Sequence, residues 1–207
     1  QNSPDAQKMV AMAYLNGEGL EKDHAKAIPF LQKSAQSGDW ESQFLLAESY
    51  DKGLDIAKDP VQAAAWYKKA AEQENVDAQY RLGNMFFYKV GIPEDIDEAI
   101  KWYKKAAEQG QVDAQFNLGV LLATGDGARR DYCQAVTWFR KAAAQGDAGA
   151  QYNLGVMLAT GQGIGRDDDR AVTWLKRAAA QGHYDAQRVL SYWGLRGNVG
   201  LDCQVFK

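Results

Sequence analysis

Hydrophobic and polar positions along this chain repeat every 36 residues. An Ala-Gln or Ser-Gln dipeptide marks each period, and its first residue is taken here as position 0. A fixed period of this length is typical of solenoid repeats, in which each unit is one supersecondary element. Position 0 falls at Ala6, Ser42, Ala78, Ala114, Ala150 and Ala186.

The first half of each period predicts a helix, called helix A. Positions 0, 4, 5, 7 and 8 hold small or apolar residues on one helical face. Glycine at position 5, in Gly83, Gly119 and Gly155, costs about 1 kcal/mol relative to alanine in a helix. We therefore expect the backbone of a partner helix to approach closely there. A Gly-x-Gly segment such as 161–163 then ends the helix.

The second half predicts a helix B that begins at an aspartate N-cap. Its apolar stripe carries Trp or Phe at position 24, which predicts tryptophans in the core. Glycine is expected to end this helix in the left-handed conformation. Glu74 replaces that glycine in the second unit and is predicted to loosen the turn, whereas Pro29 is predicted to kink its helix. The capping residues are Asp23, Asp59, Asp95, Asp131 and Asp167, and the tryptophans are Trp66, Trp102, Trp138 and Trp174.

A single unit cannot bury both of its apolar faces, so the units must stack. The predicted fold is all-α, a right-handed α-solenoid of helix-turn-helix repeats with a 36-residue period. Eleven helices are expected in one domain over 6–207, and residues 1–5 are expected to be an N-terminal extension. Repeats start at 6, 42, 78, 114 and 150, with a partial sixth at 186.

The unit resembles the Sel-1-like repeat, a relative of the tetratricopeptide repeat. The resembling segments are Ala-Gln-Tyr-Asn-Leu-Gly (150–155), the loop glycines Gly161 and Gly163, the capping Asp167, and Ala-Val-x-Trp-Leu (171–175). The resemblance implies protein binding, as in adaptors, assembly factors, secreted host-binding proteins and proteins that neutralise a toxic effector. A cysteine-rich branch of the family is linked to β-lactam binding, but its cysteine pairs are missing here.

Composition gives little support for catalysis or for a metal or cofactor site. The net charge of −3, from 24 basic and 27 acidic residues, provides no electrostatic reason to bind nucleic acid. No run of 18 apolar residues is present, so we expect no membrane span. The sequence has two histidines and two cysteines, which excludes most metal-site and cysteine–histidine chemistries, and we expect no cofactor. The Gly-x-Gly segments lack the preceding strand of a dinucleotide-binding loop, and Asp167–Asp169 lack calcium-loop spacing.

Two properties stay open at this stage. Cys133 and Cys203 are either paired or free. We expect a periplasmic or secreted protein from which any signal peptide has been removed.

A partner surface is predicted on helix A, at positions 3, 6 and 10. These positions lie within a 60° arc away from the apolar stripe, and they vary between units while the core positions do not. Arg81, Tyr88, Tyr192 and Arg196 are the expected anchors, because Tyr and Arg are favoured at interface hot spots. The alternative is that these positions are unconstrained surface. The predicted stripe comprises Leu45, Glu48, Lys52, Arg81, Asn84, Tyr88, Asn117, Val120, Thr124, Asn153, Val156, Tyr192 and Arg196.

These observations favour a non-enzymatic protein that clamps a protein partner in a concave groove and is monomeric when free. A bacterial immunity protein that neutralises a secreted toxic effector is one specialised version. An adaptor or assembly factor in cell-envelope or secretion machinery is the alternative. A cell-wall or small-molecule hydrolase using His24 or His183 ranks lower, and an architectural homo-oligomer is a further possibility.

Overall fold

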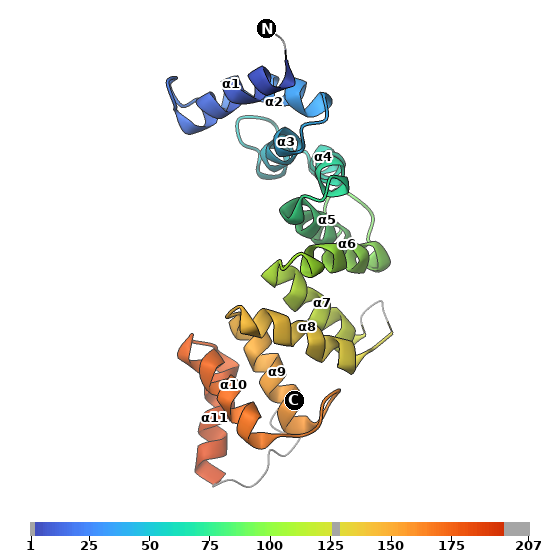
Figure 1. Cartoon of the computed structure of the whole chain (residues 1–207), viewed down its shortest axis with the longest axis vertical. Coiled ribbons are helices and arrows are strands. Elements are labelled where there is room, and N and C mark those ends of the chain that lie inside the picture. Colours follow the sequence, from blue (N-terminus) through green and yellow to red (C-terminus); the bar gives the residue numbers. More distant parts are fainter. Residues whose placement is uncertain (1–2, 126–128, 197–207) are drawn as a thin grey trace. The chain divides into compact units, whose positions relative to one another are not determined.

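A computed structural model describes residues 3–125 and 129–196 of the chain, the last three by their backbone alone. This part contains eleven α-helices of 13 residues each and no β-strand (Figure 1). Within it, none of the helices has the length and apolar content needed to cross a membrane. The helices are α1 (Pro4–Asn16), α2 (His24–Gln36), α3 (Trp40–Lys52), α4 (Pro60–Glu72), α5 (Val76–Tyr88), α6 (Ile96–Glu108), α7 (Val112–Thr124), α8 (Tyr132–Ala144), α9 (Ala148–Thr160), α10 (Asp168–Ala180) and α11 (Tyr184–Arg196).

Odd-numbered helices are the predicted A helices and even-numbered helices are the predicted B helices, so the fold class is confirmed. The chain forms two compact units, residues 1–105 and residues 106–207. The single domain over 6–207 therefore stays a prediction. Helix α1 begins at Pro4, so Pro4 and Asp5 belong to the first helix.

The five aspartates at position 17 cap the B helices as predicted. The Asp23 carboxylate accepts from the Lys26 amide at 2.9 Å, and Asp167 accepts from the Arg170 amide at the same distance. Asp59, Asp95 and Asp131 make equivalent bonds. Each bond satisfies one of the amides that a helix leaves unpaired at its start.

Glycine at position 5 makes room for a side chain of helix B. A Cβ atom on Gly83 would lie 2.7 Å from the Tyr103 ring, and one on Gly119 would lie 2.8 Å from the Phe139 ring. Gly155 faces Leu175 in the same way. The close approach was predicted, but the nearest group is a side chain at position 25; the backbone of the partner helix comes close only at Gly155, where the Ala171 carbonyl oxygen would lie 3.2 Å from the added Cβ.

The in-register tryptophans lie in or beside the core. Trp102 and Trp138 are buried, whereas Trp66 and Trp174 are half-buried. A cation three residues later covers each ring: Lys69, Lys105, Lys141 and Arg177 lie 3.8, 4.4, 4.1 and 4.6 Å from the respective ring centroids. Three lysines and one arginine of the B helices thus stack on aromatic faces, where the ring attracts the cation.

Two predicted irregularities are accommodated. Glu74 adopts φ 66°, the left-handed conformation that glycine adopts at Gly38, Gly110, Gly146 and Gly182, so the turn keeps its geometry. A side chain in that conformation carries a strain of about 1 kcal/mol. Helix α2 continues through the exposed Pro29 without interruption.

Candidate partner-binding surface

In the first unit, helix α5 presents the two residues best placed to contact a partner. The Tyr88 side chain is 63% exposed and meets the Phe87 ring edge-on, with centroids 4.8 Å apart. Arg81, two turns earlier, is half-buried and makes no hydrogen bond or ion pair within the described residues. A large exposed aromatic ring and an unpaired guanidinium on one helix are the features expected of interface anchors.

The other predicted residues of this unit already have intramolecular partners. Lys52 Nζ lies 2.6 Å from a Glu48 carboxylate oxygen, an exposed i,i+4 pair of small net energy. Asn84 Oδ1 accepts from the Tyr103 hydroxyl at 2.7 Å. Leu45 is half-buried and packs on the core around Leu31 and Leu46. Because their polar groups or apolar surfaces are already in contact within the chain, these residues are less available to a partner than Arg81 and Tyr88.

Beneath this surface lies a buried hydroxyl. Tyr67 is fully buried and its hydroxyl oxygen has no partner in hydrogen-bonding geometry among the described residues. Burial raises the pKa of this hydroxyl, and the charges of Asp51 and Glu48 raise it further while Arg81 opposes them. The equivalent Tyr103 is satisfied by Asn84, whereas Glu48, the counterpart of Asn84, is paired with Lys52. The first unit thus carries charged groups around a buried hydroxyl, with the Asp51 carboxylate as its nearest acceptor.

In the second unit the stripe is uncharged on α7 and α9. The two helices carry the same triplet, so this part of the stripe varies less than the sequence analysis implied. Its polar groups bond to their own helices: the Thr124 and Thr160 hydroxyls donate to the carbonyls of Val120 and Val156 at 3.1 and 2.9 Å. Asn153 Nδ2 donates to the Gly149 carbonyl at 3.0 Å. The triplets are Asn117–Val120–Thr124 and Asn153–Val156–Thr160.

At α11 the predicted stripe is only partly exposed. Tyr192 is 37% exposed, but Val189 at position 3 is fully buried and cannot contact a partner. Trp193, which lies at a different repeat position from the other tryptophans, is also buried. The Arg196 side chain lies outside the described residues.

A network of glutamines that was not predicted from the sequence joins neighbouring repeats. Gln at position 1 donates to the carbonyl of an alanine near the end of the preceding helix B, as in Gln43 to Ala35 at 3.1 Å and Gln151 to Ala143 at 3.2 Å. A second glutamine closes the network, because Gln181 Nε2 donates to Gln151 Oε1 at 2.9 Å. The Ala-Gln dipeptide shows the repeat period in the sequence, but the hydrogen bonds of its buried glutamine were not predicted.

The loop glycines are structural. A Cβ atom on Gly91 (φ 74°) would collide with the backbone of Pro60 at the start of α4, and one on Gly163 (φ 69°) would collide with that of Tyr132 at the start of α8. Each loop thus packs tightly on the preceding helix B. This geometry supports the interpretation of the Gly-x-Gly segments as turns.

The histidines and cysteines that were candidates for catalysis or metal binding lie outside this surface. His183 stacks on Tyr152, with centroids 4.7 Å apart, and its Nδ1 accepts from the Ala186 amide at 3.4 Å. His24 is the first residue of α2. Cys133 is an exposed free thiol, and Cys203 lies outside the described residues. Within the described part, no three His, Cys, Asp or Glu side chains are placed to hold a metal ion.

Repeated pairs of helices with a core of small and apolar residues define a helical-repeat scaffold for protein–protein interaction. The Sel1 repeat model matches residues 4–39, 40–75, 76–111, 112–147 and 148–183. The chain belongs to the Sel1 repeat family, whose repeats mediate protein–protein interaction and whose fold is generally non-enzymatic. No curated protein matches the sequence.

Solved structures of bacterial proteins are similar to this chain. A Sel1 repeat protein from Oxalobacter formigenes is 36% identical over 93% of this chain and 79% of its own, with a TM-score of 0.84. A protective antigen of uropathogenic Escherichia coli with an SLR fold is 32% identical over 95% of this chain, with a TM-score of 0.87. The match spans only 42% of the antigen's length. An immunity protein of Pseudomonas aeruginosa is less similar. It is 23% identical over 88% of this chain and 67% of its own, with a TM-score of 0.46.

Proposed function

We propose that this chain is a non-enzymatic binding protein that holds a protein partner against its A helices, with Arg81 and Tyr88 as anchors. The observation that carries the proposal is the exposed Tyr88 ring on the same helix as the unpaired, half-buried Arg81. Aromatic rings and guanidinium groups contribute most when a partner desolvates them fully. The surrounding pairs, such as Lys52 with Glu48, would form a polar rim.

The uncharged triplets of α7 and α9 support a second contact area of different chemistry. The threonines and the Asn153 amide bond to their own helices, so the half-buried valines provide the apolar part of this area. Such a surface suits an uncharged segment of the partner. The charged area of the first unit suits a segment with polar side chains.

Within this class we propose neutralisation of a toxic bacterial effector outside the cytoplasm, with an adaptor or assembly role as the alternative. The two roles differ in stoichiometry and lifetime. An immunity protein forms a tight one-to-one complex that abolishes the effector's activity, whereas an adaptor exchanges partners. The hydrolase alternative loses support from His183, which caps α11 and stacks on Tyr152.

The experiment is recovery of the partner on the immobilised protein from an extract of the source organism, followed by mass spectrometry and calorimetry. One stoichiometric partner is expected, and a toxic enzyme inhibited by the complex would establish immunity. Exchangeable partners would establish the adaptor role. Recovery of no partner by a folded, monodisperse protein would overturn the proposal.

A further inference from the structure

Asp51 of α3 carries a charge that the described part of the first unit does not compensate. Its half-buried carboxylate makes no ion pair within the described residues. The neighbouring Lys52 is already paired with Glu48 at 2.6 Å. The charge of Arg81 acts on the Tyr67 hydroxyl, but its guanidinium makes no ion pair with Asp51. A carboxylate that is partly removed from water without a counterion destabilises a fold, so Asp51 does not serve folding stability.

The buried Tyr67 hydroxyl lies beside the same carboxylate. It has no partner in hydrogen-bonding geometry among the described residues, and Asp51 is its nearest acceptor. A carboxylate has about four acceptor sites. Asp51 can therefore accept from Tyr67 on its inner side and from a second donor on its solvent side, and the described part of the chain supplies only the inner donor.

Tyr67 and Tyr103 hold the same repeat position in different surroundings. Gly83 leaves room for the Tyr103 ring, since a Cβ atom there would lie 2.7 Å from it. In the repeat of Tyr67 the glycine is replaced by Ala47, so the Tyr67 ring cannot lie as close to its helix A. The Tyr103 hydroxyl has an acceptor at 2.7 Å, whereas the Tyr67 hydroxyl is left beside Asp51.

An acidic side chain at position 9 occurs in this repeat alone. Elsewhere in the sequence the position is apolar, and a departure from a repeated pattern that lowers stability is typical of a functional site. The residues at position 9 of the other A helices are Leu15, Phe87, Ala123, Ala159 and Leu195.

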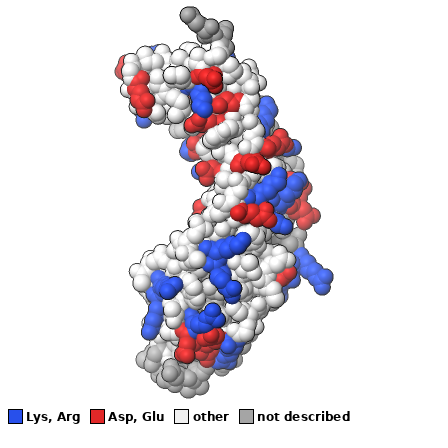
Figure 2. Space-filling view, in the orientation of Figure 1, with Lys and Arg blue, Asp and Glu red and all other residues white. Residues whose placement is uncertain are grey.

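An organic cation is the ligand that fits this place. Within the described residues, Asp51 and Glu48 have no third side chain with which to hold a metal ion. Tyr88, which follows the position-9 residue of the next helix A, offers an exposed ring whose face attracts an ammonium or guanidinium group. Acidic and basic side chains are interspersed on the visible face of the first unit (Figure 2), so a local contact and not a broad field selects the cation.

We infer that Asp51 binds a lysine or arginine side chain of the protein partner, with the Tyr67 hydroxyl as its inner hydrogen-bond donor. The inference rests on the proposed function and adds the chemistry of the partner segment that faces α3. The basic group donates to the solvent side of the Asp51 carboxylate, a charge-assisted hydrogen bond. The charge of Asp51 is then compensated in the complex and not in the free protein.

Thermal unfolding of the free protein tests the uncompensated charge. Asp51→Asn removes that charge and keeps an acceptor for Tyr67, so the unfolding midpoint should rise by about 1–4 °C. Asp77→Asn, exposed in the first turn of α5, removes a charge that favours the helix start and should not raise it. A midpoint that stays or falls in Asp51→Asn would show that the fold compensates the carboxylate, and would overturn the inference.

Nuclear magnetic resonance of the full chain tests the ligand, with acetyl-Gly-Arg-Gly-amide as the probe and its glutamine counterpart as the control. The arginine peptide should shift the Asp51 and Tyr67 signals and saturate in the millimolar range. Asp51→Asn should weaken this binding at least about fivefold, whereas Asp77→Asn should retain it. Equal responses to the two peptides, or of Asp51→Asn and the parent, would overturn the inference.

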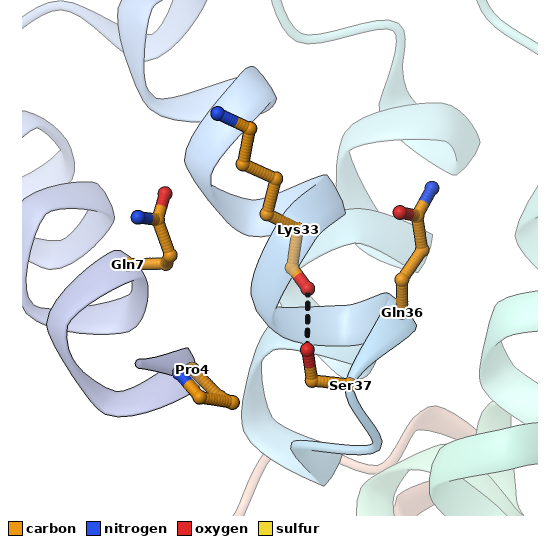
Figure 3. Close-up of a pocket in the computed structure, with 5 residues that line it drawn as sticks. All are labelled: Pro4, Gln7, Lys33, Gln36 and Ser37. Carbon is orange, nitrogen blue, oxygen red and sulfur yellow. Dashed lines mark hydrogen bonds between the residues drawn. The ribbon is translucent and has the colours of Figure 1, made fainter. Parts of the chain in front are cut away.

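A pocket between α1 and α2 provides an internal control in the same titration. Its described lining includes the Lys33 ammonium and no carboxylate (Figure 3). Because like charges repel, the signals of this lining should not respond to the arginine peptide. A response as large as that of Asp51 would show nonspecific binding and would overturn the inference. The lining residues are Pro4, Gln7, Lys33, Gln36 and Ser37.

Failure of this inference differs from failure of the proposed function. A recovered partner whose affinity depends on Tyr88 but not on Asp51 would overturn the inference alone. Recovery of no partner would overturn the proposed function, while the unfolding midpoint and the peptide titration would still decide whether Asp51 binds a basic group.

Discussion

Gln145 Nε2 donates to Gln115 Oε1 at 2.9 Å across 30 residues of sequence. Gln115 in turn donates to the carbonyl of Ala107, and Gln145 also donates to the carbonyl of Gly110. The same arrangement joins Gln73 to Gln43 in the first unit. Two glutamine side chains from the following repeat thus satisfy two carbonyls at the end of one repeat, one in helix B and one in the turn after it. Buried polar networks of this kind fix register, because a shifted arrangement would leave their members unsatisfied.

Removing one glutamine should destabilise the second unit. Gln115→Ala leaves the Ala107 carbonyl without its partner in a buried site and removes one of the two acceptors of the Gln145 amide, so we expect a loss of about 1–3 kcal/mol in the free energy of unfolding. Urea denaturation measures it. Gln187→Ala removes the equivalent bond to Ala179 at an exposed site and should cost much less. Equal losses for the two variants would show that burial of the network contributes nothing.

The loop glycines offer a comparison between equivalent positions. Gly91→Ala and Gly19→Ala introduce the same left-handed strain, but only the first collides with Pro60. We expect Gly91→Ala to cost at least about 1 kcal/mol more than Gly19→Ala in thermal or urea unfolding. Similar losses would mean that the loop does not pack tightly on the preceding repeat.

Lysines on tryptophan faces should differ from their solvated neighbours. Lys105 lies 4.4 Å from the Trp102 centroid, so Lys105→Ala should reduce stability by about 0.5–1 kcal/mol. Lys141→Ala should act similarly through Trp138. Arg140→Ala, at an exposed position beside Lys141, should change stability by less than about 0.5 kcal/mol. No difference between Lys141→Ala and Arg140→Ala would exclude a stabilising contact.

Acid should weaken the cap of α8. Hydrogen bonds from the Gln134 amide lower the pKa of the Asp131 carboxyl below its ordinary 3.8, so the folded state binds this proton less readily than the unfolded state. The resulting stability is present above pH 3.8 and is lost as the pH falls through the lower, folded pKa. Asp131→Asn keeps a capping oxygen without a charge, so the variant should lose less stability than the parent between pH 7 and pH 3 in urea titrations. Equal losses of unfolding free energy in the variant and the parent would show that Asp131 does not contribute to the acid sensitivity.

Periodicity predicted the fold because each repeat position has one environment. Aspartate at position 17 caps five helices, and Gly119 allows the predicted close approach, although the group that approaches is the Phe139 ring. The surface was harder to predict because exposure depends on neighbours outside the repeat. Val189 occupies a stripe position but is buried, and Asn84 occupies another but bonds to Tyr103. The role of Gln115 required knowledge of which carbonyl lies opposite it.

The most direct test of partner binding on the A helices is the affinity of the recovered partner for Tyr88→Ala beside that for Tyr184→Ala. Tyr184 is 72% exposed and lies outside the predicted stripe, so it controls for loss of an exposed ring. If Tyr88 is an anchor, its loss should weaken binding by about 2 kcal/mol, roughly 30-fold, while Tyr184→Ala stays within about twofold. Unchanged affinity for Tyr88→Ala, with both variants folded, would contradict the account and place the interface elsewhere.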